Sequence, residues 1–320
     1  MYTIRVEAKV KIQLINCYTL PMNDEFIRNA QSWGEEGEKW LANIPTIIAE
    51  YSQKWSLQVV PPYPLSYNYV APATRSDGTD AVLKIGFPGD REFKTEIEAL
   101  TIFNGDGAVK LLEADREKAV ILLERVTPGV PLSEEVDDEK ATRILSSVIQ
   151  KLHKPLPSSH TFMTIDGWIK ELSNFHNKPD SIIQPLPLDL INKARELFTY
   201  LIKTSAPGVL VHGDLHHDNV LSSARAGWIG IDPKGIASEP TYEVAAMIRN
   251  PYQKLKNVIN LEEMLHRRIL ILSEELGFNP LRIHQWCLAQ TVLSAVWNHG
   301  EAKGSEHAIR VARALEKLSF

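Results

Sequence analysis

Apolar and polar residues recur with two different periods along the chain, one typical of strands and one typical of helices. Strands predominate among the elements predicted in a first region, and helices in a second. In the first region, residues 67–73 and 81–85 fit the two strands of a hairpin, with Asp77-Gly78 as the turn. The period then predicts a helix over 92–103 and two further strands over 109–112 and 119–123. In the second region, helices are predicted at residues 139–153, 188–204, 241–249, 261–276, 281–299 and 308–318.

The residues before the hairpin carry weaker signals. Residues 4–12 alternate apolar and charged side chains, which is the period of a half-buried strand. From Asn23, a typical capping residue, to about Trp55 the pattern is helical, and Pro45 is expected to divide this stretch into two helices. Residues 57–60 then favour a strand before two consecutive prolines.

Together these elements predict an α+β fold with two lobes. Residues 1–126 would form a small lobe of antiparallel strands with a helix, preceded by an N-terminal extension and helices. Residues 127–320 would form a larger, mainly helical lobe. Thr127-Pro128-Gly129 marks the change and is expected to act as a hinge.

Composition removes several classes of protein. With 320 residues, 44% of them hydrophobic, the chain can bury a full core. The 35 basic and 40 acidic residues give a formal charge of -5 without a basic stripe, so no nucleic-acid partner is expected. The two cysteines match neither a disulfide framework nor a paired-thiol metal site and fit a reducing cytoplasm. No apolar run reaches the roughly 18 residues of a spanning helix, so neither a membrane anchor nor a signal peptide is expected.

The chemistry is concentrated in one polar stretch between apolar runs, residues 209–221, and in the segment that follows it, residues 228–235. Phosphoryl transfer needs a carboxylate near the attacking hydroxyl and oxygen ligands that hold Mg²⁺ on the phosphates. Asp214 can accept the proton of an acceptor hydroxyl, and Asn219 and Asp232 offer the hard oxygen ligands that Mg²⁺ prefers.

A cation for the phosphates is also available in the first region. Lys84 lies within an apolar strand, where a charged side chain is costly to bury unless an anion meets it. Glu96, on the next predicted helix, is a natural partner for it. Lys234 lies beside Asp232 and either approaches the phosphates or only screens that acid.

These motifs resemble a known family. The spacing from His212 through Asp214 to Asn219, with Asp232 one hairpin later, resembles the catalytic and metal-binding loops of protein-kinase-like enzymes. Glycine follows the histidine, as in aminoglycoside phosphotransferases. The wording HGDLHHDNVL, with IDPKG and YEVAAMIRNP, is similar to the aminoglycoside/hydroxyurea antibiotic-resistance kinases, which include the streptomycin 6-phosphotransferases. The resemblance extends over about residues 67–299.

The resemblance implies a bilobal protein-kinase-like fold and a role for each matching residue. Asp214 would be the catalytic base, Asn219 and Asp232 the Mg²⁺ ligands, and Glu243 a structural carboxylate bonded to backbone N–H groups. The remaining implied residues serve the nucleotide: Lys84 on the α- and β-phosphates, Glu96 as its ion-pair partner, and the backbone of Glu124 and Val126 around the adenine. Residues 66–72 replace the glycine-rich phosphate loop, which leaves the choice between ATP and GTP open.

The resemblance also implies a reaction. The enzyme would transfer the γ-phosphoryl group of ATP or GTP to a hydroxyl of a small molecule, either an aminoglycoside such as streptomycin, at its 6-hydroxyl, or a related metabolite. A cationic aminoglycoside would need carboxylates, and the helical lobe offers Asp166, Glu171, Glu239 and Glu301.

Two alternatives from other classes remain open. The dense cluster of His212, Asp214, His216, His217 and Asp218 could serve a metal-dependent hydrolase. The same scaffold could also be a non-catalytic nucleotide-binding protein.

Overall fold

The computed structural model describes residues 22–167, 172, 186–298 and 302–320. The strand predicted over residues 4–12 lies outside the described residues. The chain divides into two compact units, residues 1–87 and 88–320. The lobe boundary predicted between residues 126 and 127 stays a prediction.

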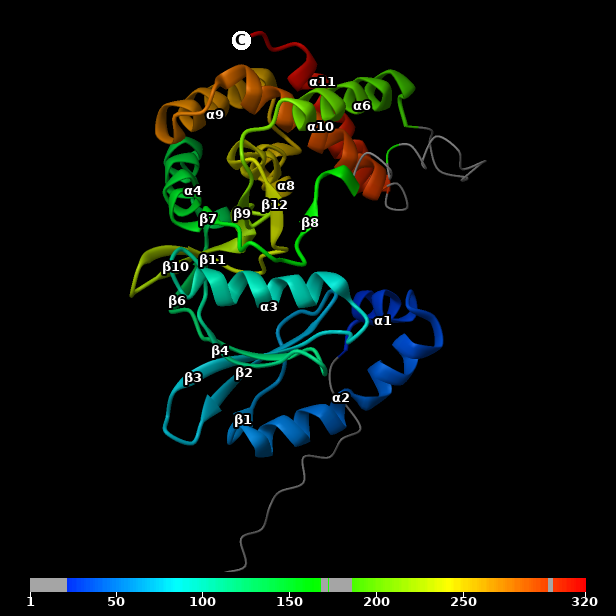
Figure 1. The fold of residues 1–320 in the computed structure, drawn as a ribbon, viewed down its shortest axis with the longest axis vertical. Helices are drawn as coiled ribbons and strands as arrows, with labels where there is room; N and C mark the ends of the chain where they lie inside the picture. Colours follow the sequence, from blue (N-terminus) through cyan, green and yellow to red (C-terminus); the bar gives the residue numbers. More distant parts are fainter. Residues whose placement is uncertain (1–21, 168–171, 173–185, 299–301) are drawn as a thin grey trace, which may run out of the picture. The chain divides into compact units, whose positions relative to one another are not determined.

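The first unit consists of two helices followed by antiparallel strands (Figure 1). Strand β2 pairs with β1 on one side and with β3 on the other, and the β2–β3 register runs from Tyr69 opposite Ile85 to Thr74 opposite Asp80. The hairpin predicted around Asp77-Gly78 is therefore confirmed. The elements are α1 (Asp24–Gln31), α2 (Gly34–Lys54), β1 (Leu57–Val59), β2 (Tyr69–Arg75) and β3 (Asp80–Ile85).

The helical stretch of this unit breaks at a different place from the one predicted. Helix α1 begins at the cap residue Asn23, whose side chain accepts the N–H of Phe26 at 2.9 Å, and it ends at Gln31. Helix α2 starts at Gly34, whose positive φ of 66° suits glycine, and continues through Pro45. The prediction of a break at Pro45 was wrong. A buried stripe that includes Ile44 runs along α2, which packs on β1, and this burial offsets the hydrogen bond that proline cannot donate.

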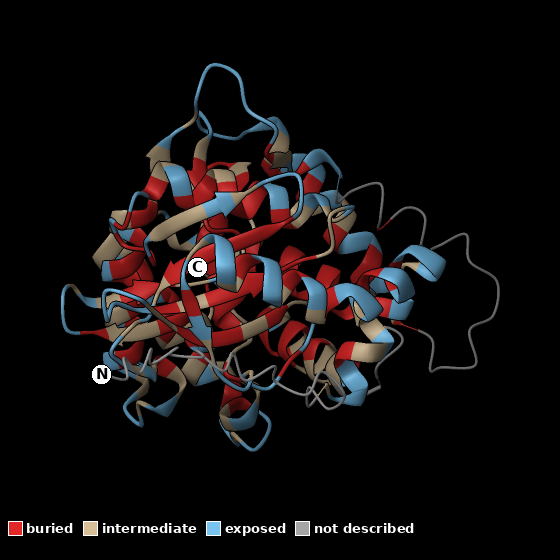
Figure 2. Ribbon diagram, turned by 90° about the horizontal axis from the view of Figure 1, so that it is seen from below, coloured by how far each residue is buried: buried red, intermediate tan, exposed pale blue. Residues whose placement is uncertain are grey.

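The second unit is mainly helical, as predicted, so the α+β class is confirmed. Helix α10, in which 11 of 18 residues are buried, packs against α6, α9 and α11 (Figure 1) and also against α7, and α4 packs against α9. Figure 2 shows buried and exposed positions alternating along the helices and mainly exposed positions in the outer loops. The helices are α3 (Arg91–Phe103), α4 (Asp138–Leu152), α6 (Leu188–Lys203), α7 (Ala245–Ile248), α8 (Tyr252–Leu255), α9 (Leu261–Leu276), α10 (Pro280–Trp297) and α11 (Ala302–Glu316).

Short strands of the second unit frame the polar stretch. Strands β4 and β5 form an antiparallel hairpin, β10 lies between β11 and β6, and a further sheet has the order β7-β9-β12-β8. The strands are β4 (Leu111–Asp115), β5 (Val120–Glu124), β6 (Pro128–Pro131), β7 (Lys154–Pro155), β8 (Met163–Thr164), β9 (Val209–Val211), β10 (Val220–Ser223), β11 (Gly227–Gly230) and β12 (Ile236–Ser238).

One predicted helix has a different form. Residues 241–249 were predicted as one helix, whereas the chain forms the 3-10 turn η3 (Pro240–Val244) and the single turn α7. Two other 3-10 turns are η1 (Leu132–Glu134) and η2 (His217–Asn219). Of the helices that the structure describes, none is both long enough and apolar enough to cross a membrane.

Candidate active site

The polar loop begins where strand β9 ends. Strand β9 pairs antiparallel with β12, with Val211 opposite Ile236, so the loop after β9 and the loop before β12 emerge at the same edge. Gly213 has a positive φ of 86°, and a Cβ atom there would lie 2.6 Å from Ile236 Cδ1. Both facts favour glycine, because an L side chain would be strained at this φ and its Cβ would press on the Ile236 side chain.

A buried carboxylate anchors this turn. Glu243, in η3, accepts the N–H of His212 on Oε2 at 2.5 Å and the N–H of Gly213 on Oε1 at 3.0 Å. Burial raises the pKa of Glu243 to about 7, although these two hydrogen bonds act in the opposite direction. The role expected for Glu243, a structural carboxylate on backbone N–H groups, is confirmed.

The His212 side chain connects the two polar loops. Its Nδ1 accepts the N–H of Asp214 at 3.3 Å, so Nε2 carries the proton and donates to the Ile231 carbonyl at 2.7 Å. The backbone carbonyl of His212 accepts the N–H groups of Lys234 at 2.9 Å and Gly235 at 3.2 Å. Burial lowers the pKa of the ring to about 4, which keeps it neutral in this arrangement.

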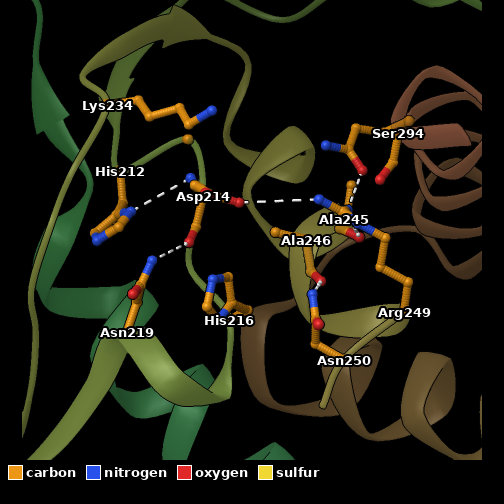
Figure 3. A network of polar contacts seen from close by, with 12 residues as sticks. His212, Asp214, His216, Asn219, Lys234, Ala245, Ala246, Arg249, Asn250 and Ser294 are labelled. Atoms are coloured by element: carbon orange, nitrogen blue, oxygen red, sulfur yellow. Dashed lines mark hydrogen bonds and ion pairs between the residues drawn. The ribbon is translucent and has the colours of Figure 1, made fainter. Parts of the chain in front are cut away.

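Asn219 and Asp232 lie at the same end of one hairpin. Strands β10 and β11 pair with Val220 opposite Gly230, and the Ile231 N–H donates to the Asn219 carbonyl at 2.9 Å. The Asn219 amide donates Nδ2–H to the Asp214 carbonyl at 3.0 Å (Figure 3), which leaves Oδ1 as an available ligand. Asp232 is exposed and has a positive φ of 57°. An amide oxygen and a carboxylate on one edge fit a hard cation such as Mg²⁺.

Asp214 lies among cationic groups in Figure 3. Burial alone would raise the pKa of this carboxyl, but attraction to His216, Lys234 and Arg249 outweighs burial, so its pKa lies below the ordinary value. The carboxylate is therefore ionised at neutral pH. Arg249 Nη2 lies 3.8 Å from Asp214 Oδ1.

The comparison with known proteins decides the family. A model of the aminoglycoside/hydroxyurea antibiotic resistance kinase family matches residues 58–302. The chain belongs to this family. Members of this resistance-kinase family are phosphotransferases, and the protein is accordingly a phosphotransferase with a hydroxyl group as acceptor.

Two curated relatives are similar to this chain over most of its length. Streptomycin 6-kinase of Streptomyces griseus is 28% identical over 293 residues, which are 90% of this chain and 94% of that protein. Hydroxyurea phosphotransferase of Kitasatospora aureofaciens is 29% identical over 288 residues, covering 88% of this chain and 82% of that protein.

Solved structures share the fold of this chain. Choline kinase LicA from Streptococcus pneumoniae superposes with a TM-score of 0.62 at 16% identity, covering 86% of this chain and 100% of that chain. A thermostable mutant of aminoglycoside phosphotransferase APH(4)-Ia, in ternary complex with ADP and hygromycin B, gives a TM-score of 0.59 at 14% identity, covering 85% of this chain and 98% of that chain. The predicted protein-kinase-like fold, with an antiparallel-sheet N-lobe and a helical C-lobe, is confirmed.

The residues expected around the nucleotide lie on regular elements. Lys84 is on β3 and is 3% exposed, and Glu96 is on α3 and is 5% exposed. The ion pair predicted between them stays a prediction. Glu124 is the last residue of β5, where its N–H donates to the Lys110 carbonyl at 3.0 Å, and Val126 follows two residues later. Their contact with adenine stays a prediction.

The metal cluster of the hydrolase alternative is not assembled. Within residues 22–167, 172, 186–298 and 302–320, no three His, Cys, Asp or Glu side chains are grouped so that they could hold a metal ion. Both ring nitrogens of His212 are engaged by backbone groups, and His217 is 1% exposed. The His216 ring accepts the N–H of Asp218 on Nδ1 at 3.2 Å. These histidines shape the loop instead of converging on a common point.

The carboxylates that were expected to bind a cationic substrate differ in what the structure shows of them. Glu239 is buried, with ion-pair partner Arg282 at 2.7 Å and a hydrogen bond from the Trp286 indole, so it has a structural role. Glu171 and Glu301 lie outside the described residues, and the role of Asp166 stays a prediction.

Sequence reasoning did not single out Arg249 as a site residue. The sequence feature that could have pointed to Arg249 is its position as a single cationic residue at the end of the apolar run Val244–Ile248. A charge that is so little exposed needs an opposite charge nearby, and the Asp214 carboxylate lies 3.8 Å from the Arg249 guanidinium.

Proposed function

We propose that the protein transfers the γ-phosphoryl group of ATP or GTP, with Mg²⁺, to a hydroxyl group of an aminoglycoside such as streptomycin, or of a related hydroxylated metabolite. The family supports the reaction, and the similarity to streptomycin 6-kinases supports streptomycin and its 6-hydroxyl as the first acceptor to test. The fold alone would not support a substrate, because one fold serves many acceptors.

One observation carries the proposal. The Asn219 amide donates to the Asp214 carbonyl at 3.0 Å, and the Ile231 N–H donates to the Asn219 carbonyl at 2.9 Å. These bonds connect the backbone of the predicted base, Asp214, with the predicted metal ligand Asn219, and connect Asn219 with Ile231, the residue before Asp232. They support an arrangement that is set by the chain itself. Such preorganisation is what phosphoryl transfer requires, because its catalysis consists of positioning and electrostatic stabilisation.

Each residue then has a defined task. The Asp214 carboxylate accepts a hydrogen bond from the acceptor hydroxyl, orients it for in-line attack and takes its proton. Asn219 Oδ1 and the Asp232 carboxylate would hold Mg²⁺, and this ion, when bound, neutralises the charge of the phosphates. His212 and Glu243 keep the loop rigid by bonding its backbone.

The nucleotide has its own set of residues in this proposal. Lys84 would neutralise the α- and β-phosphates, with Glu96 as its partner, and the backbone of Glu124 and Val126 would bind the adenine. The burial of Lys84 and Glu96 supports this assignment, because each buried charge needs an opposite charge to compensate the loss of water.

The test is a phosphorylation assay with Mg²⁺ and either ATP or GTP. The acceptor panel contains streptomycin, other aminoglycosides and hydroxyurea, which is included because a relative is a hydroxyurea phosphotransferase. Mass spectrometry identifies the phosphorylated product, and Asp214→Asn, with its strongly reduced rate, is the matched control. A streptomycin phosphate that disappears in this variant supports both the reaction and the acceptor. Nucleotide binding without any phosphorylated aminoglycoside contradicts the acceptor class.

A further inference from the structure

Arg249 is the cationic side chain that faces the predicted base from the helical part of the second unit. Its Nη2 lies 3.8 Å from Asp214 Oδ1, and Figure 3 shows the two side chains extending toward each other. The Arg249 side chain is 11% exposed and that of Asp214 is 27% exposed. An arginine in such surroundings stays charged, so the Asp214 carboxylate is always next to a fixed positive charge.

Hydrogen bonds to other parts of the second unit hold Arg249 in place. Nη1 donates to the Ala245 carbonyl at 3.2 Å and to Oε1 of Gln290, a residue of α10 that is 2% exposed. The Arg249 carbonyl accepts a hydrogen bond from His307 Nε2, on α11, at 2.8 Å. Side chain and backbone of Arg249 are thus fixed by three elements, α7, α10 and α11.

We propose that Arg249 is a positioning residue of the phosphoryl transfer: anchored by Gln290, it holds Oδ1 of Asp214 and leaves Oδ2 to the acceptor hydroxyl. The inference rests on the proposed function, because Asp214 must be the group that orients the acceptor.

The geometry supports this division between the two oxygens. A carboxylate rotates about its Cβ–Cγ bond unless one oxygen is held, because this torsion is broad and roughly two-fold. At 3.8 Å the ion pair is longer than a hydrogen bond, so Arg249 attracts the carboxylate electrostatically without replacing the acceptor as its hydrogen-bond donor. A loss of orientation of about 1 Å can reduce a reaction rate by roughly 100-fold.

The experiment compares Arg249→Ala, Arg249→Lys and wild type. We expect Arg249→Ala to lower kcat by about 10- to 100-fold while KM for the nucleotide changes little, because Arg249 acts on the base and not on the nucleotide. Guanidinium ion added at concentrations that do not unfold the protein should restore part of the lost rate. The kcat of Arg249→Lys should lie between those of wild type and Arg249→Ala, because an ammonium group keeps the charge but not the planar fork of the guanidinium.

Two controls separate positioning from folding. Arg282, at the start of α10, is also well anchored, because it pairs with Glu239 at 2.7 Å and donates to the Leu201 carbonyl at 3.0 Å. Arg282→Ala should lower the melting temperature without a kcat loss that guanidinium restores. In the Asp214→Asn background, Arg249→Ala should cost little further rate, because a residue that acts through Asp214 has nothing left to position.

The outcomes are distinct. An unchanged kcat in Arg249→Ala overturns the proposal. The proposal is also overturned if guanidinium does not restore the kcat of Arg249→Ala and the loss of kcat adds fully to the loss in Asp214→Asn. Slow hydrolysis of the nucleotide, with water as acceptor, is measured in parallel. If wild type phosphorylates none of the acceptors, the proposed acceptor class fails, while the hydrolysis rates of wild type and Arg249→Ala still decide whether Arg249 positions Asp214.

Discussion

The Arg225 guanidinium and the Glu124 carboxylate form a bidentate ion pair between segments 101 residues apart. Arg225 Nε lies 3.0 Å from both Glu124 oxygens, and its two terminal nitrogens donate to the carbonyls of Gly105 and Ala108, each at 2.8 Å. The turn of the β10–β11 hairpin is thereby tied to the end of β5. That hairpin has Asn219 and Asp232 at its other end, and β5 leads into the predicted adenine-binding residues.

This ion pair predicts that Arg225→Met binds nucleotide more weakly. Loss of the pair releases the end of β5, so the affinity for ADP should fall by about 10-fold, which corresponds to roughly 1.4 kcal/mol. Calorimetric titration of ADP and of inorganic tripolyphosphate measures the effect, and Arg225→Lys is the matched control. Tripolyphosphate binding should be unchanged, because it lacks a base. An equal loss for both ligands would show that Arg225 supports the phosphate site instead.

The predicted base gives a direct kinetic expectation. Asp214→Asn keeps the shape of the side chain but removes the carboxylate, so kcat should fall by at least about 100-fold. The affinity for nucleotide, measured by titration with ADP, should stay within about 2-fold, because the hydrogen bonds of the Asp214 backbone remain. A variant with wild-type kcat would rule out Asp214 as the base.

The two predicted metal ligands should respond differently to conservative changes. Asn219→Ala removes both the oxygen ligand and the donor to the Asp214 carbonyl, whereas Asn219→Asp keeps an oxygen and loses only the donor. We expect Asn219→Ala to need a higher Mg²⁺ concentration for half-maximal rate than Asn219→Asp. Asp232→Asn, which tolerates the positive φ of 57°, should also raise the Mg²⁺ requirement while the protein stays folded. Identical Mg²⁺ titrations for the variants and wild type would contradict this assignment.

His212 predicts how stability depends on pH. Burial lowers its pKa to about 4 in the folded protein, against an ordinary value of 6.5. Between these values the unfolded chain binds the proton and the folded chain does not, so the free energy of unfolding decreases as pH falls from 6.5 to about 4. The full loss is on the order of 3 kcal/mol. Denaturant titrations across this range test it, and His212→Gln should flatten the slope. An unchanged slope in this variant would assign the acid sensitivity to other groups.

The close approach of Gly213 to Ile236 predicts a large effect of one methyl group. Gly213→Ala adds a Cβ only 2.6 Å from Ile236 Cδ1 at a positive φ of 86°, so it should lose on the order of 2–4 kcal/mol of unfolding free energy through strain and overpacking. Gly78→Ala is the matched control. Its φ of 85° is nearly the same, but nothing lies within 4 Å of the added Cβ, so only the strain of about 1 kcal/mol remains. Equal losses in the two variants, measured by denaturant titration, would exclude the collision.

Local patterns predicted much of the fold. The β2–β3 hairpin followed from alternation around Asp77-Gly78, and the helices that became α3, α9 and α10 followed from their apolar stripes. The break at Pro45 and the continuous helix at 241–249 were wrong. Helix α2 packs against β1, and η3 packs against α10, and these contacts are not contained in a local period.

The sequence by itself predicted the chemistry of the site: residue type and spacing led to Asp214 as base and to Asn219 and Asp232 as Mg²⁺ ligands, which stay predictions. The family resemblance implied the anchoring role of Glu243, which the hydrogen bonds of its carboxylate confirm. Only the tertiary structure decided which charges meet. Arg249 reaches Asp214 from 35 residues away, and Arg225 reaches Glu124 from 101 residues away. A buried charge is stabilised by whichever opposite charge the fold brings near, and that partner has no fixed distance along the chain.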